Sequence, residues 1–126
     1  MFGHIGITIN NKVDIQNFYK DILGMQEIKE FKIPTKISKK IFKLEKNTSI
    51  VVLAKDNFVL ELFYCQEKVT PVYNHIAIYQ NNRMAFVDRV EEKGYPVHII
   101  SRENKKDLIF VEDHSGNKIE ISEYPD

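Results

Sequence analysis

The sequence has one cysteine, no excess of either charge and no long hydrophobic run. Cys65 is the only cysteine, so no internal disulfide can form and the reducing cytoplasm is the expected compartment. The 18 lysine and arginine residues are balanced by 18 aspartate and glutamate residues. Such a balance gives no sign of the clustered basic surface that nucleic-acid binding generally requires. We therefore expect no nucleic-acid partner.

Membrane and export signals are also lacking. The longest wholly apolar run, IVVLA, is far too short to cross a bilayer. The N-terminal stretch MFGHIGITINNK has neither the basic start nor the apolar core of a signal peptide. At 126 residues, with 43% hydrophobic and 29% charged residues, the chain has the length and composition of one globular domain. These features predict a soluble cytoplasmic protein without a membrane partner.

The predicted elements occur twice in the same order. HIGITI alternates like a strand, and the next residues place apolar side chains at helical spacing up to Gly24, before a series of strand-like runs. The order restarts at HIAIYQ, which a helix ending at Gly94 and three more strands follow. We predict an α+β fold in which each half is a βαβββ module with a curved, mostly antiparallel sheet. The expected bounds are one domain over 1–126, with repeats over about 1–66 and about 72–126.

Lysines concentrate in the segment PTKISKKIFK, residues 34–43. The run KKIFKLEK, residues 39–46, is interpreted as a strand. Lysine commonly protects an exposed sheet edge from pairing with another chain. A solvated strand edge is therefore preferred here over a phosphate or polyanion site.

Four strands each carry one potential metal ligand opposite their aliphatic side chains. These residues are His4 in HIGI, Glu61 in VLELF, His75 in HIAI and Glu120 in NKIEIS. Side chains alternate between the two faces of a strand, so all four are expected on the face opposite the helices. A carboxylate among large apolar neighbours is costly to desolvate unless it meets a cation or several donors. Two imidazoles and two carboxylates suit a divalent metal, which we predict at this position.

The same stretches resemble the vicinal oxygen chelate superfamily. This superfamily includes glyoxalase I, extradiol dioxygenases, methylmalonyl-CoA epimerase, fosfomycin-resistance enzymes and bleomycin-resistance proteins. The matching features are HIGITI, FYKDILGM, LELF, HIAI and FVEDHSGNKIEISE, and they span nearly the whole chain. The last of these is similar to a frequent ending of the family, with His114 where proline is common. The resemblance implies two βαβββ modules that form an incomplete barrel around a metal.

The resemblance also implies roles for the four residues. Glyoxalase I members take one ligand from the first and one from the last strand of each module, which correspond here to His4, Glu61, His75 and Glu120. Bleomycin-binding members lack such ligands, and extradiol dioxygenases and fosfomycin-modifying members typically use two histidines and one carboxylate. The presence of Glu61 therefore favours the glyoxalase and epimerase branches. Zinc or nickel is the expected metal, with cobalt, iron and manganese as alternatives.

The implied function is a glyoxalase-like lyase or isomerase that works as a homodimer on a small molecule. The metal would stabilise an enediolate formed from two adjacent oxygens, and Glu120 or Glu61 would move a proton between neighbouring carbons. The pseudo-symmetry of the repeat does not distinguish the two glutamates. Two alternatives stay open: another metalloenzyme, either an epimerase or a dioxygenase, and a non-catalytic protein that binds a small molecule or antibiotic.

Three other residues are interpreted as structural. His98 in PVHII has no counterpart in the first half and is expected to be a structural histidine. For Arg83, a surface role is preferred over contact with a substrate. Cys65 ends an apolar strand without a neighbouring histidine in the sequence, so we expect a small core residue and not a nucleophile.

Overall fold

The structure, a computed structural model, describes residues 3–125. The chain divides into two compact units, residues 1–69 and 70–126. The first unit contains β1 (Ile5–Ile9), η1 (Ile15–Lys20), β2 (Gln26–Ile33), α1 (Thr35–Ile37), η2 (Ser38–Phe42), β3 (Thr48–Lys55) and β4 (Phe58–Tyr64). The second contains β5 (His75–Tyr79), α2 (Arg83–Glu92), β6 (Val97–Arg102), β7 (Lys105–Glu112) and β8 (Lys118–Ser122). The boundary between the units lies between Val69 and Thr70.

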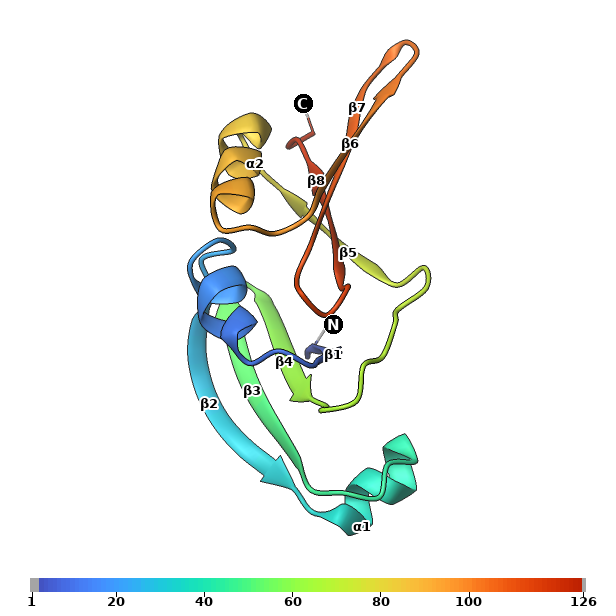
Figure 1. Cartoon of the computed structure of the whole chain (residues 1–126). Helices are drawn as coiled ribbons and strands as arrows, with labels where there is room; N and C mark the ends of the chain where they lie inside the picture. The colour runs from blue at the N-terminus through green and yellow to red at the C-terminus, as the bar shows by residue number, and fades with distance from the viewer. Residues whose placement is uncertain (1–2, 126) are drawn as a thin grey trace. The chain divides into compact units, whose positions relative to one another are not determined.

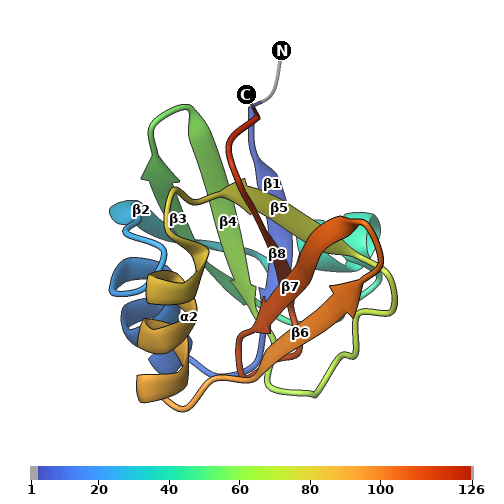
Figure 2. The same cartoon turned by 90° about the horizontal axis from the view of Figure 1, so that it is seen from above.

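Each unit contains one four-stranded mixed sheet (Figures 1 and 2). The strand order is β1-β4-β3-β2 in the first unit and β5-β8-β7-β6 in the second. The first and last strands of each unit pair in parallel, and the other pairs are antiparallel. No strand pairing joins the two sheets among residues 3–125. The predicted α+β class with two βαβββ modules is confirmed, and hydrogen bonding does not close the sheets into a barrel.

Alternating burial sets the two faces of each sheet. In β4, Leu60 and Leu62 are each 1% exposed while Glu61 between them is partly exposed. In β8, Ile119 and Ile121 are buried to the same extent on either side of Glu120. A shift of one residue in either strand would bring the glutamate into the core and expose the aliphatic side chains. Burial therefore fixes which face each glutamate occupies.

The first helical segment is wider than the predicted α-helix. In η1, the amide of Asp21 donates to the carbonyl of Gln16, and that of Leu23 donates to Phe18, five residues back in each case. Phe18 and Tyr19 are fully buried, as helical spacing predicts. Gly24 follows with φ +73°, a left-handed conformation that glycine adopts without steric cost. None of the helices among the described residues is long and apolar enough to span a membrane.

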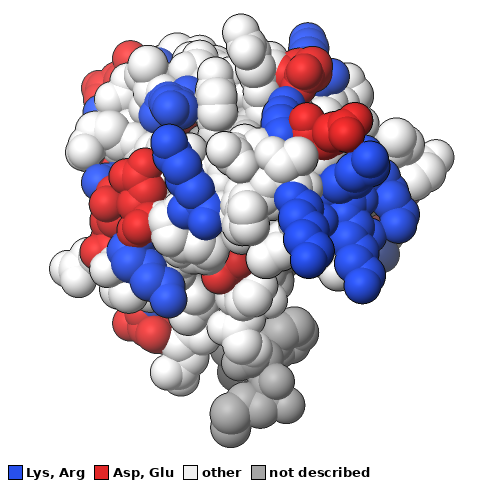
Figure 3. Space-filling view, turned by 90° about the horizontal axis from the view of Figure 1, so that it is seen from below, with Lys and Arg blue, Asp and Glu red and all other residues white. Residues whose placement is uncertain are grey.

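The lysine-rich segment is helical, so its interpretation as a strand was wrong. Residues 35–37 form α1 and residues 38–42 form η2. Ile37 and Ile41 stand four positions apart, a helical spacing that the density of lysines obscured. Figure 3 views the molecule from the side on which α1 lies in Figure 1, and basic side chains gather in its right-hand part. The lysines here belong to a helical segment and do not protect a sheet edge.

The turn that leads into β8 is built around Asp113. Its buried carboxylate accepts hydrogen bonds from the backbone amides of Ser115 and Asn117, at 2.9 and 2.8 Å, and from the side-chain amide of Asn117 at 2.8 Å. Gly116 in the same turn has φ +86°. Because Asn117 immediately precedes β8, these bonds set where the strand that carries Glu120 begins.

We predict that Asp113→Ala destabilises the second unit by about 3 kcal/mol, because it leaves several buried donors without an acceptor. Asp113→Asn keeps one acceptor oxygen and should have a smaller effect. Urea unfolding followed by circular dichroism measures both variants against Glu103→Ala in the exposed β6–β7 turn, which should behave like the unmodified protein. Equal unfolding midpoints for Asp113→Ala and Glu103→Ala would contradict the role given to Asp113.

Gly6 in β1 makes a close approach to Phe63 in β4. A Cβ atom placed on Gly6 would lie 2.9 Å from Cε1 of the Phe63 ring. Phe63 also forms an edge-to-face contact with Phe42 of η2, with ring centroids 5.2 Å apart. The absence of a side chain at Gly6 thus allows the ring to lie over the first strand.

Gly6→Ala should therefore displace the Phe63 ring and cost about 1–3 kcal/mol of stability, as overpacking typically does. Gly3→Ala is the matched control, since a Cβ at Gly3 meets no atom within 4 Å. Thermal unfolding measures the difference between the two variants, and aromatic NMR shifts report the ring. An unchanged Phe63 environment in Gly6→Ala would refute the close approach.

Candidate functional site

Each unit brings one histidine next to one glutamate. In the first unit, Nε2 of His4 lies 3.3 Å from Oε1 of Glu61. The imidazole is half exposed and the carboxylate is 15% exposed. His4 immediately precedes β1, and Glu61 lies in the middle of the adjacent strand β4.

The second unit repeats this arrangement with His75 and Glu120. Nε2 of His75 lies 3.6 Å from Oε1 of Glu120, and the two side chains are 45% and 28% exposed. Nδ1 of His75 lies 2.9 Å from the backbone carbonyl oxygen of Tyr73. A carbonyl oxygen only accepts, so Nδ1 carries the hydrogen and, in the neutral ring, Nε2 retains its lone pair. Ser122 donates a hydrogen bond to Oε2 of Glu120 at 3.3 Å.

The two pairs hold the same register in their sheets. Gly6 is the strand partner of Glu61, and Ala77 is the strand partner of Glu120. Each histidine stands two positions before that partner residue. The equivalence of the two halves that the sequence predicts is therefore present in the backbone, down to single residues.

The donors in each pair suit a divalent cation. Two ligands about 2.0–2.2 Å from a tetrahedral metal lie roughly 3.4 Å from each other. The measured separations of 3.3 and 3.6 Å are close to that value. Among residues 3–125, no three His, Cys, Asp or Glu side chains form a group that could hold a metal ion. Each unit by itself thus supplies two suitable ligands.

Aromatic and polar side chains share the glutamate face in each unit. Phe63 stands two positions after Glu61, and Ser122 stands two positions after Glu120. His75 contacts Phe110 edge to face, with ring centroids 5.5 Å apart, and Phe110 is the strand partner of Glu120. The residue two positions beyond the glutamate is therefore aromatic in the first unit and carries a hydroxyl in the second.

A third histidine–glutamate pair was not predicted. Nε2 of His98 in β6 lies 2.5 Å from Oε2 of Glu112 in β7. Since a carboxylate accepts, Nε2 of His98 is the donor, opposite to the arrangement at His75. The pair depends on the β6–β7 register, which contains an irregularity between Ile100 and Arg102. No sequence signal marks that register.

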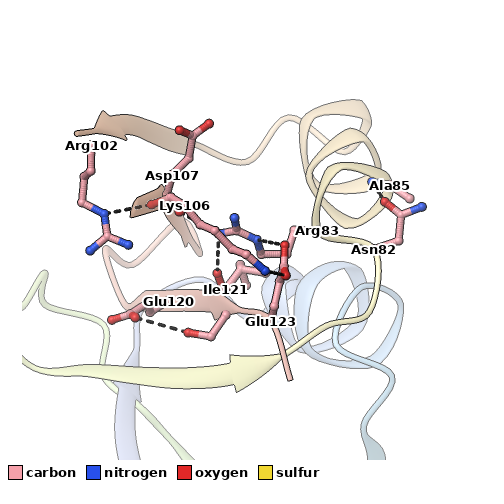
Figure 4. Close-up of polar contacts among 10 residues, drawn as sticks. Asn82, Arg83, Ala85, Arg102, Lys106, Asp107, Glu120, Ile121 and Glu123 are labelled. Atoms are coloured by element: carbon pink, nitrogen blue, oxygen red, sulfur yellow. Dashed lines mark hydrogen bonds and ion pairs between the residues drawn. The ribbon is translucent and has the colours of Figure 1, made fainter. Parts of the chain in front are cut away.

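Arg83 does not lie at the surface, so that expectation was wrong. Its side chain is 12% exposed and lies beside a cavity of about 290 Å³ that Glu120 also lines (Figure 4). Its Nη1 donates to the backbone carbonyls of Asp107 and Ile121, at 2.8 and 3.3 Å. The guanidinium therefore bridges β7 and the end of β8. This role was not predictable from the sequence, because it depends on how the two strands diverge.

Cys65 is buried, as predicted, and it belongs to a polar cluster. Its Sγ donates to Glu67 at 3.2 Å and lies 3.4 Å from Nζ of Lys46. The Lys46 ammonium, with the thiol, lowers the pKa of the Glu67 carboxyl to about 2, and Glu67 in turn raises the pKa of Lys46. The cluster orders the end of β4 and contains no histidine.

Comparison with solved structures shows which folds are similar. A glyoxalase family protein from Enterococcus faecalis superposes with a TM-score of 0.75 at 21% identity, over 98% of this chain and 97% of that one. A fosfomycin resistance protein, FosX, from Listeria monocytogenes superposes with a TM-score of 0.75 at 13% identity, over 99% and 93%. A mutant of that protein, solved with Mn(II) and 1S,2S-dihydroxypropylphosphonic acid, gives 0.75 at 16% identity, over 99% and 93%. At these identities the likeness shows the fold alone.

Comparison of sequences identifies the family. No curated protein sequence matches the chain. The sequence profile of the Glyoxalase/Bleomycin resistance protein/Dioxygenase superfamily matches residues 1–121. This match confirms the resemblance that the strand and turn motifs predict. Because it covers nearly the whole chain and the solved structures share the fold, the chain belongs to the Glyoxalase/Bleomycin resistance protein/Dioxygenase superfamily.

Proposed function

We propose that the protein is a metal-dependent enzyme of glyoxalase type, a lyase or isomerase that acts on a small substrate with two adjacent oxygens. The repeated histidine–glutamate pair carries this proposal, because two equivalent pairs stand in the same register of two sheets. We propose that one divalent cation takes His4, Glu61, His75 and Glu120 as ligands. Zinc or nickel suits these donors best, with cobalt, iron or manganese as alternatives.

Each proposed role in the reaction belongs to a named residue of the chain or to the bound cation. A bound divalent cation supplies stabilisation for negative charge that develops on the substrate oxygens. Glu120 or Glu61 removes a proton from one carbon and returns it to the neighbouring carbon, as general base and then general acid. Glu120 also lines the cavity between β7 and β8, which supports assigning the proton transfer to it. The Ser122 hydroxyl orients its carboxylate.

We propose that the enzyme is a cytoplasmic homodimer and that the two modules of each chain form one domain. Two other functions are alternatives to the glyoxalase reaction. An epimerase or dioxygenase would use the same cation for a different reaction. A non-catalytic protein that binds a small molecule or antibiotic would need no metal. The pairing of both glutamates with histidines favours the metal-dependent alternatives over the last one.

We predict that the protein, purified without chelator, binds about one divalent cation per chain. Removal of a residue that only orients a metal ligand typically costs 10- to 100-fold in affinity, so His75→Ala, which removes a ligand, should cost more than about 100-fold. His4→Ala should behave similarly. Isothermal titration calorimetry with zinc, nickel and manganese, together with elemental analysis, measures both quantities.

His98→Ala is the matched control for this experiment. His98 also faces a glutamate and is similarly exposed, but its Nε2 is the hydrogen-bond donor. It should bind metal like the unmodified protein. Equal losses in His75→Ala and His98→Ala, or no binding by any protein, would rule out the proposed ligand set. A mixture of His4→Ala and His75→Ala then distinguishes a metal site within one chain from a metal site shared by two chains. Metal binding is partly restored only in the second case, in which each site takes one histidine–glutamate pair from each chain of a dimer.

The reaction type is tested on the metal-loaded protein with methylglyoxal and several thiols, including glutathione. Thioester formation that depends on both His75 and Glu120 supports the glyoxalase reaction. Inactivity with every thiol, in a protein shown to hold its metal, would favour the epimerase or dioxygenase function.

We further predict opposite tautomers for two histidines of the metal-free protein. In the neutral ring, His75 should carry its hydrogen on Nδ1, because it donates to the Tyr73 carbonyl, whereas His98 should carry it on Nε2, because it donates to Glu112. Long-range ¹⁵N–¹H NMR spectra at alkaline pH separate the two forms. A neutral His75 ring with its hydrogen on Nε2 would contradict the availability of that nitrogen for a metal, and a neutral His98 ring with its hydrogen on Nδ1 would contradict the role of His98 as donor to Glu112.

A further inference from the structure

A cavity opens in the second unit where β7 and β8 diverge. Their ladder joins Phe110, Val111 and Glu112 to the residues of β8 from Glu120 back to Lys118. The stretch 106–109 of β7 and residues 120–125 line a cavity of about 290 Å³ beyond these pairs. Glu120, a proposed metal ligand, lies at the point where the ladder ends. The cavity therefore adjoins the proposed site.

Arg83 lines one side of this cavity. The two hydrogen bonds from its Nη1 to the carbonyls of Asp107 and Ile121 satisfy backbone groups on both sides of the opening. Its buried Nε has no hydrogen-bond partner among the described residues, and the nearest carboxylate oxygen, Oε1 of Glu123, is 3.6 Å away. A guanidinium fixed in this way contributes a positive charge that Glu123, a carboxylate shared with Lys106, compensates only in part.

Arg102 and Lys106 add two more cations from the β6–β7 hairpin. Lys106 forms an ion pair with Glu123, and the Nε of Arg102 donates to the carbonyl of Lys106 at 3.0 Å. No partner is found for the terminal nitrogens of Arg102 among the described residues. Lys106 and, less strongly, Arg83 lower the pKa of Glu123, which indicates a positive environment at this carboxyl.

The charged side chains that line the cavity balance in number but not in pairing. Three cations, Arg83, Arg102 and Lys106, line it together with three carboxylates, Asp107, Glu120 and Glu123. Figure 4 shows the Asp107 carboxylate directed away from Glu120 and Glu123. The formal charge of the lining is therefore zero. Glu123 pairs with Lys106 and Arg83, which leaves the terminal nitrogens of Arg102 as the donors open to a ligand.

We infer that this cavity binds the anionic group of the substrate, a small oxyanion of the carboxylate or phosphate class, through Arg102 and Lys106. The assignment rests on the proposed function, since it places the substrate beside Glu120. A guanidinium with free terminal nitrogens offers two parallel donors, the geometry that matches a carboxylate or phosphate. The volume is near the lower end of the range for small-molecule sites, so a small substrate fits it.

The test uses the full chain, first without metal, and three probes: inorganic phosphate, methylphosphonate and acetate. Each is titrated at low ionic strength, because salt screens exposed charges, and backbone NMR shifts of β7 and β8 report binding. Arg102→Ala and Lys106→Ala should each weaken the Kd of the best probe by about tenfold or more. Lys105→Ala, in the same hairpin but not lining the cavity, should change it less than twofold. The ranking of the probes separates carboxylate from phosphate chemistry.

A second variant tests the link to the metal ligands. Glu120→Gln removes a negative charge from the cavity wall and should tighten probe binding in the metal-free protein. Equal weakening in Lys105→Ala and Arg102→Ala, or no binding of any probe at millimolar concentration, would overturn the inference. If metal binding fails but the probes bind in an Arg102-dependent manner, the proposed function falls and the anion site stands. If metal binds and no probe does, the anion site falls and the proposed function stands.

Discussion

The parallel pairing of the first and last strands is the constraint on which the candidate site depends. In both units this pairing sets the histidine two positions before the residue that faces the glutamate. The buried aliphatic residues beside each glutamate hold the register, because a slip by one position would exchange the faces. Hydrophobic burial on one side of the sheet thus positions the polar groups on the other side. Hydrogen bonds from Ser122 to Glu120 and from His75 to the Tyr73 carbonyl then orient the side chains of the second pair.

The two units share this backbone plan but differ in what surrounds the pairs. In the first unit, Gly6 leaves room for Phe63, and the ring packs against Phe42. In the second unit, Ala77 occupies the position equivalent to Gly6. Ser122, with its hydroxyl group, occupies the position equivalent to Phe63. A duplicated scaffold can keep its ligand positions because they are set by register, while side chains around them change with little effect on the pairing. The position two residues beyond the glutamate is therefore apolar in one module and polar in the other.

Much of the fold was predictable because alternation and repetition are local signals. The strands that carry the four candidate ligands follow directly from their apolar–polar pattern, and the equivalence of His4 with His75 follows from the repeat. The helical segment at residues 35–42 was missed because lysines between its apolar residues imitate a protected edge strand. The roles of Arg83 and His98 were missed for another reason. Both depend on contacts between strands, a divergence of β7 from β8 and an irregular β6–β7 register, which no local pattern encodes.

Equivalence in register does not make the two glutamates equivalent in chemistry. The Glu61 side chain is 15% exposed, about half the exposed fraction of the Glu120 side chain. Glu120 is 28% exposed and lines a cavity to which Arg83, Arg102 and Lys106 also contribute. A carboxylate acts as a base only if the substrate reaches it, and positive neighbours draw an anionic substrate toward it. The pseudo-symmetry of the backbone therefore gives two matching ligands, whereas the asymmetry of the side chains favours Glu120 as the one that exchanges a proton.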